Sequence, residues 1–138
     1  KYIILMGLFS FFGKKDNGQF VSAEAFEEKS AIQLNMLPVL MEKLRELNVD
    51  EDRELMLEFF FYTNTYQKAQ TFAQELSNLN YQVKYGVSEG NKKLFIITGW
   101  TIKVKMKDAV VAAWIRQMCS LGYKFDCEFD GWGTIPDQ

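Results

Sequence analysis

The chain has 138 residues, of which 48% are hydrophobic and 25% are charged, and these values are typical of a single globular domain. Its formal net charge of −2 argues against a nucleic-acid-binding domain, because such domains usually carry a basic excess. The sequence contains no histidine, which removes the commonest general base and the commonest metal ligand. We therefore expect no catalytic residues, no metal site and no cofactor.

Residues 1–21 are expected to be a flexible, apolar and basic lead-in to the domain. Met6 has the character of a natural start, so residues 1–5 are interpreted as an addition or as a piece of an upstream segment. The apolar run over 2–12 is too short to span a bilayer, and membrane attachment is not expected. The domain itself is expected to occupy residues 22–138.

The domain is expected to begin with a helix over 22–47. Ser22 is suited to cap its first turn, and leucines recur at helical spacing on one side after residue 37. Pro38 is expected to kink this helix or to divide it in two. The remaining elements are expected to be a strand over 55–63, a helix over 65–78, strands over 81–87 and 94–105, a helix over 107–121 and a strand over 123–134.

After the first helix the expected order of elements is βαββαβ, in a core over 54–134. Two βαβ-like halves joined by a hairpin are typical of the ferredoxin-like fold, an α+β class with an antiparallel sheet and both helices on one face. The strand order of that fold, 4-1-3-2, places the last strand at an edge of the sheet. The two cysteines, Cys119 and Cys127, fit no metal-ligand spacing and are expected to be small buried residues of a cytoplasmic protein.

The last strand, KFDCEFDGWGT over 124–134, alternates acidic and apolar residues. Phe125, Cys127 and Phe129 are expected to point toward the helices. The opposite, open face of the sheet is expected to carry Asp126, Glu128, Asp130 and Trp132 from this strand, Met56, Phe60 and Tyr62 from the first, and Phe95, Ile97, Lys103 and Lys105 from the third. A face that is apolar in the middle and rimmed by charge is typical of a binding surface.

Other interpretations of this strand stay open. Edge strands often carry charges that prevent pairing with other chains, and the acidic row fits that role. The apolar side of residues 37–47 is an alternative cover for the open face. Trp132, between two glycines, fits either a partner contact or a side chain that closes the domain. Three acids also suggest a metal-dependent enzyme, but carboxylates two residues apart spread along a flat strand, which disfavours a shared cation.

The segment YKFDCEFDGWGT, residues 123–134, resembles the C-terminal signature of the RraB family, the regulators of ribonuclease E activity B. The resemblance covers about residues 24–134. It implies a cytoplasmic, non-enzymatic regulator that binds a protein partner, ribonuclease E or another component of RNA decay, and that makes no direct contact with nucleic acid.

The resemblance also suggests how the partner is bound. An acidic row suits docking on a basic segment of a partner, and tryptophan is a favoured anchor in such contacts. The candidate partner-binding residues are Asp126, Glu128, Asp130, Trp132, Phe60 and Tyr62. The alternative function is a homo-oligomeric structural domain, such as a homodimer, whose open sheet pairs with its own copy.

Overall fold

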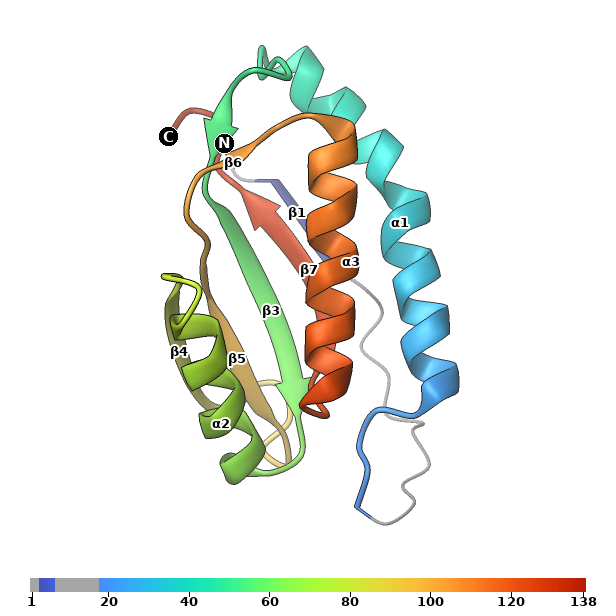
Figure 1. Cartoon of the computed structure of the whole chain (residues 1–138), viewed down its shortest axis with the longest axis vertical. Helices are drawn as coiled ribbons and strands as arrows, with labels where there is room; N and C mark the ends of the chain where they lie inside the picture. Colours follow the sequence, from blue (N-terminus) through green and yellow to red (C-terminus); the bar gives the residue numbers. More distant parts are fainter. Residues whose placement is uncertain (1–2, 7–17) are drawn as a thin grey trace.

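A computed structural model describes residues 3–6 and 18–138 of the chain (Figure 1). Its helices are α1 (Ala23–Glu46), α2 (Tyr66–Ser77) and α3 (Asp108–Lys124). Its strands are β1 (Ile3–Met6), β2 (Glu54–Leu55), β3 (Leu57–Thr63), β4 (Gln82–Val87), β5 (Phe95–Trp100), β6 (Val104–Lys105) and β7 (Glu128–Thr134). Helices together with antiparallel strands confirm the predicted α+β class.

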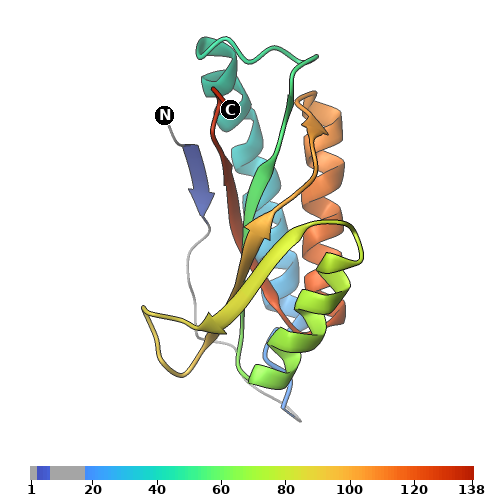
Figure 2. The ribbon, with the colours of Figure 1, turned by 90° about the vertical axis from the view of Figure 1, so that its left-hand side faces the viewer.

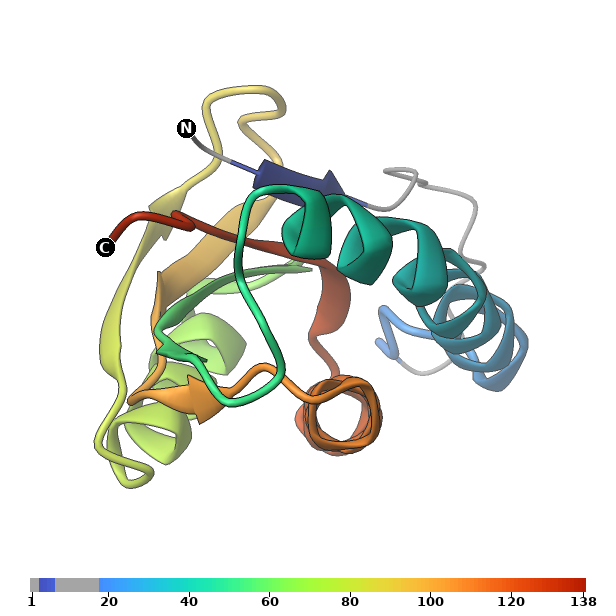
Figure 3. The same ribbon diagram turned by 90° about the horizontal axis from the view of Figure 1, so that it is seen from above.

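The main sheet is antiparallel, with its strands in the order β1-β7-β3-β5-β4. Seen from above, α2 and α3 lie on the same side of this sheet (Figure 3). The prediction that the last strand lies at an edge is wrong, because β1 pairs with β7 from Ile3 opposite Thr134 to Met6 opposite Gly131. Part of the expected lead-in thus supplies an extra strand, and the described sheet ends at β1 and β4.

Both long strands predicted at the centre of the sheet are interrupted near one end. The hydroxyl of Thr101 accepts the N–H of Leu57 at 2.9 Å, and the N–H of Thr101 donates to the Leu57 carbonyl at 2.9 Å. The preceding residue, Met56, bonds instead to the C-terminal residues: its N–H donates to Gln138 Oε1 at 2.6 Å, and its carbonyl accepts the Thr134 hydroxyl at 2.8 Å. Beyond this break, β2 and β6 pair separately as a two-stranded sheet.

The predicted N-terminal helix is present as α1. The hydroxyl of Ser22 accepts the N–H of Ala25 at 3.0 Å, which confirms the predicted cap. The helix is not divided at Pro38, which lies on its exposed side, because the burial of Leu37 and Leu40 beside it holds the helix across the missing hydrogen bond. The buried side of α1, which carries Leu37 and Leu40, packs along α3 and against β7, so α1 does not cover the open face of the sheet (Figure 3).

The last strand begins later than predicted, because α3 extends through the expected turn. After the helix, Asp126 adopts a left-handed φ of 61°, and the N–H of Cys127 reaches back to the Gly122 carbonyl at 2.7 Å. These are the features of a Schellman helix ending. A Cβ on Gly122 would lie 2.5 Å from the Cys127 carbonyl oxygen and 2.8 Å from the Phe61 ring, so only glycine allows this approach.

Aromatic side chains fill the space between the sheet and the helices. The rings of Phe61 from β3 and Phe72 from α2 meet edge to face at 4.6 Å. Cys119 and Cys127 are buried with free thiols, as predicted. Burial raises the pKa of the Cys127 thiol to about 12, so this residue acts as a small apolar side chain of the core.

Candidate functional site

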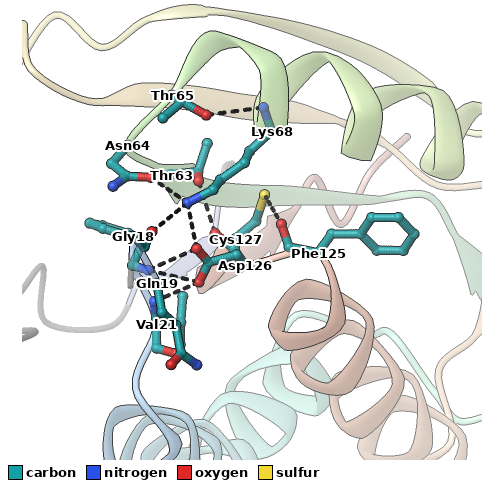
Figure 4. A network of polar contacts seen from close by, with 11 residues as sticks. Gly18, Gln19, Val21, Thr63, Asn64, Thr65, Lys68, Phe125, Asp126 and Cys127 are labelled. Carbon is teal, nitrogen blue, oxygen red and sulfur yellow. Dashed lines mark hydrogen bonds and ion pairs between the residues drawn. The ribbon is translucent and has the colours of Figure 1, made fainter. Parts of the chain in front are cut away.

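Asp126, the first acid of the predicted row, lies outside β7 in the turn after α3. Its carboxylate oxygens accept the N–H of Phe20 at 2.9 and 2.7 Å, the N–H of Val21 at 2.8 Å and the ammonium of Lys68 at 2.6 Å (Figure 4). Lys68 also donates to the Gly18 carbonyl at 2.9 Å. Asp126 therefore ties the segment before α1 to the first turn of α2.

Asp126→Asn is expected to lower the free energy of unfolding by about 2 kcal/mol, because hydrogen bonds to a charged acceptor are worth more than neutral ones. Urea unfolding measures this loss, with Asp137→Asn at an exposed position as the matched control. Lys68→Met is expected to be destabilising as well, and the double variant to lose less than the sum of the two. Unchanged stability in Asp126→Asn would contradict the contacts in this turn.

Glu128 and Asp130, the other acids of the row, both contact α1. The ammonium of Lys29 lies 3.6 Å from Glu128 Oε2 and 3.6 Å from Asp130 Oδ1, and these three side chains are 10% exposed or less. The side-chain amide of Gln33 donates to the Asp130 carbonyl at 3.2 Å. We call Lys29, Glu128 and Asp130 the ionic cluster; two buried carboxylates in it face one lysine.

Burial raises the pKa of both carboxyl groups in the ionic cluster. The pKa of Asp130 rises to about 6, mainly through burial, with Lys29 opposing the shift and the Glu128 charge adding to it. Burial also raises the pKa of Glu128, and Lys29 again opposes the shift. The three predicted surface acids thus hold structural elements together, and they do not form a solvent-facing row.

Trp132 points toward the helices and not, as predicted, to the side of the acids. The register of β7 on β3 shifts between Phe60 and Phe61, so that Asp130 is an extra residue in a β-bulge. The bulge moves the following side chains by one position, which reverses their faces. Trp132 is fully buried, and its ring meets that of Trp114 on α3 edge to face at 6.0 Å.

The face of the sheet opposite the helices is built mainly from β3 and β5. Phe60 and Tyr62 lie on it, as predicted, because the alternate residues of β3 belong to the buried core. The register of β5 on β3 adds a row of partners on the same face. We call the resulting set the open-face surface: Glu58, Phe60, Tyr62, Ile96, Thr98 and Trp100.

Four residues expected on this face lie elsewhere. Ile97 is fully buried opposite Phe61, and Phe95 shares its side of β5, so both face the helices. Lys103 and Lys105 lie beyond the end of β5, and Lys105 belongs to the small second sheet. The predicted strand over 94–105 placed its odd-numbered residues on the open face, whereas β5 places its even-numbered residues there. A difference of one residue exchanges the two faces of a strand.

The open-face surface contains a hollow of about 250 Å³, whose lining includes Glu58, Trp100 and Lys84 of β4. Glu58 Oε1 is buried and has no hydrogen-bond partner among the described residues. Burial raises the pKa of Glu58, and the nearby Lys84 partly offsets this effect. The sequence interpretation missed Glu58 and Trp100 as site residues, although a lone acid within the aromatic run LMLEFFFYT was a signal.

Two further properties concern the part of the chain that the structure describes. Within residues 3–6 and 18–138, no three cysteine or carboxylate side chains are placed to hold a metal ion. The helices within the same ranges are all too short or too polar to cross a membrane.

Fold and site together define a small α+β domain in which Asp126, Glu128 and Asp130 make internal contacts. The described helices cover one face of its sheet and leave the other, aromatic face uncovered. A family model described as RraB, regulator of ribonuclease activity B, matches residues 39–134. The match covers well over half of the chain, and the chain belongs to this family, as the resemblance indicated. A search of curated proteins found no match.

Proposed function

We propose that the protein is a non-enzymatic regulator that acts in the cytoplasm by binding a protein partner through the open-face surface. Membership of a family of regulators of ribonuclease activity supports the regulatory role. The partner proposed is ribonuclease E or another component of RNA decay. We also infer that the fold is ferredoxin-like, since the elements β3-α2-β4-β5-α3-β7 place their strands in the order β7-β3-β5-β4.

The observation that carries the binding proposal is the buried oxygen of Glu58 beside a half-buried tryptophan. A buried carboxylate oxygen without a hydrogen bond costs free energy, and an arginine or lysine of a partner would remove this cost. Trp100 and Phe60 offer partly exposed rings, and aromatic residues are enriched among binding hot spots. Lys84 lies at the rim of the hollow, where its exposed side chain has room to move aside.

The proposed binding segment of the partner is therefore basic, as the sequence interpretation suggested, but its contacts differ. Asp126, Glu128, Asp130 and Trp132 support binding indirectly, by holding the domain together. Tyr62 links the open-face surface to the ionic cluster. Burial raises the pKa of its phenol, and the charge of Asp130 adds to this shift. Phe60 is half-buried and remains a candidate for direct contact, whereas Tyr62 is only 9% exposed, so a partner on this surface would contact little of its side chain.

Trp100→Ala is expected to weaken binding to purified ribonuclease E by about tenfold or more, because truncation of a central aromatic anchor removes a large share of the affinity. Glu58→Gln is expected to reduce binding and to make it less sensitive to salt. Titration calorimetry measures both effects.

Val39→Ala is the control, because Val39 on α1 is 67% exposed and lies away from the open-face surface. Wild-type affinity in folded Trp100→Ala and Glu58→Gln would show that the open-face surface is not the docking site. Absence of binding by the wild-type protein would exclude ribonuclease E as its partner.

A further inference from the structure

The outer edge of β4 has backbone groups with no described partner strand. The N–H of Ser88 donates to the Leu94 carbonyl at 2.9 Å, so this pair is a hydrogen-bonded one. Such pairs recur at every second residue of an antiparallel ladder, and the residues between them direct their backbone groups outward. These outward residues are Val83, Tyr85 and Val87, and no described residue bonds to their backbone on the outer side.

The side chains of β4 are suited to pairing with a second copy of the same strand. In an antiparallel pair centred on Tyr85, this residue lies opposite Tyr85 of the second copy, and Val83 lies opposite Val87. On the open face Lys84 lies opposite Gly86, so no two like charges are directly opposed and the glycine leaves room for the lysine. Val87 is 52% exposed in the described structure, and this pairing covers it.

The helix face beside β4 has room for a neighbouring strand. β4 and α2 lie nearest the viewer in Figure 2, and no other described element lies beyond them. A groove of about 560 Å³ runs between these two elements, and Glu75 is its one charged lining residue. Charged residues are depleted in the centres of protein interfaces, so this lining is suited to one. The other lining residues are Gln70, Thr71, Ala73, Gln74, Ser77, Val83 and Tyr85.

We propose that β4 pairs antiparallel with β4 of a second copy, about a twofold axis at Tyr85. The sheet then continues from one copy into the other, with the helices of both copies on the same side. Tyrosine and valine side chains of each copy enter the groove of the other. The open-face surface stays accessible in this dimer, so the inference goes beyond the proposed function and does not depend on it.

Gly86 allows a test of this register, because a side chain added there meets nothing within 4 Å in the single chain. Gly86→Lys places a like charge opposite Lys84 of the second copy, whereas Gly86→Glu places an opposite charge there. Sedimentation equilibrium of the full chain is expected to give a dimer dissociation constant about tenfold higher for Gly86→Lys than for Gly86→Glu. Added salt is expected to reduce this difference.

Equal dissociation constants for the two charge variants would overturn the proposed register. A wild-type chain that stays monomeric at every concentration would overturn the dimer itself.

A second pair of variants tests the backbone contact. Val87→Pro removes an N–H that points outward, where proline is tolerated on an edge strand, while Val87→Thr keeps both the N–H and the side-chain shape. The proline variant is expected to be monomeric at concentrations where the threonine variant is dimeric, with both chains folded by circular dichroism. Equal dimerisation of the two variants would overturn the pairing through β4.

Discussion

Lys29→Met is expected to lower the free energy of unfolding by about 3 to 5 kcal/mol at pH 7, because it leaves two buried carboxylates without their lysine. Methionine matches the length of the lysine stem, so the loss of packing is small. Urea unfolding followed by circular dichroism measures the change. Lys43→Met is the matched control, since Lys43 is exposed on the same helix.

The pH dependence distinguishes this effect from a simple packing defect. In the folded wild-type chain the pKa of Asp130 is raised from 3.8 to about 6, so folding favours its protonated form. The stability that this preference contributes is complete below pH 3.8 and is lost as the pH rises through about 6. Without Lys29 the pKa values of Glu128 and Asp130 rise further. The stability difference between variant and wild type is therefore expected to narrow as the pH falls from 8 to 5.

A second comparison isolates the charges of the ionic cluster. Adding Glu128→Gln and Asp130→Asn to Lys29→Met is expected to recover part of the lost stability, because neutral amides are less costly to bury than unpaired carboxylates. A stability loss that is independent of pH, and that the two amide substitutions deepen, would contradict the account of the ionic cluster.

Trp132→Ala is expected to cost about 3 to 5 kcal/mol of unfolding free energy, because a fully buried indole is replaced by a cavity between β7 and α3. The near-ultraviolet circular dichroism signal is expected to change too, since Trp132 and Trp114 are in edge-to-face contact. Chemical unfolding of the purified variant provides the measurement.

Trp100→Ala is the matched control for this second prediction. Trp100 lies half-buried on the open-face surface, so its truncation is expected to cost less stability than that of Trp132 and more partner affinity. Trp132→Ala with wild-type stability and reduced partner affinity would make Trp132 a surface anchor and contradict the buried position.

These roles explain what the segment DCEFDGWGT does in this chain. Asp126 ends α3 and holds the segment before α1, while Asp130 forms the bulge and faces Lys29. Gly131 has a φ of 155° at that bulge, a conformation open to glycine, and Trp132 closes the core. The stretch that carries the family resemblance is thus a set of structural contacts, and the proposed docking surface lies on neighbouring strands.

Several features of this protein could be predicted from the sequence because they depend on neighbours along the chain. Ser22 caps the next turn of its own helix, and the alternation over 57–63 places Phe59 and Phe61 on one face of a single strand. The same local reasoning identified the α+β class and the buried cysteines. It also predicted the sheet face on which Phe60 and Tyr62 lie, because both residues belong to a regular strand.

Tertiary structure alone decided the rest, because the outcome depended on contacts between distant segments. A bulge at Asp130 exists only relative to the register of β3, and it reverses the direction in which Trp132 points. Asp126 met Lys68, and Glu128 and Asp130 met Lys29, because folding brought α2 and α1 to the two ends of this short segment. Charge alternation in a sequence specifies where acids lie along the backbone, whereas the fold determines which cations and how much water surround them.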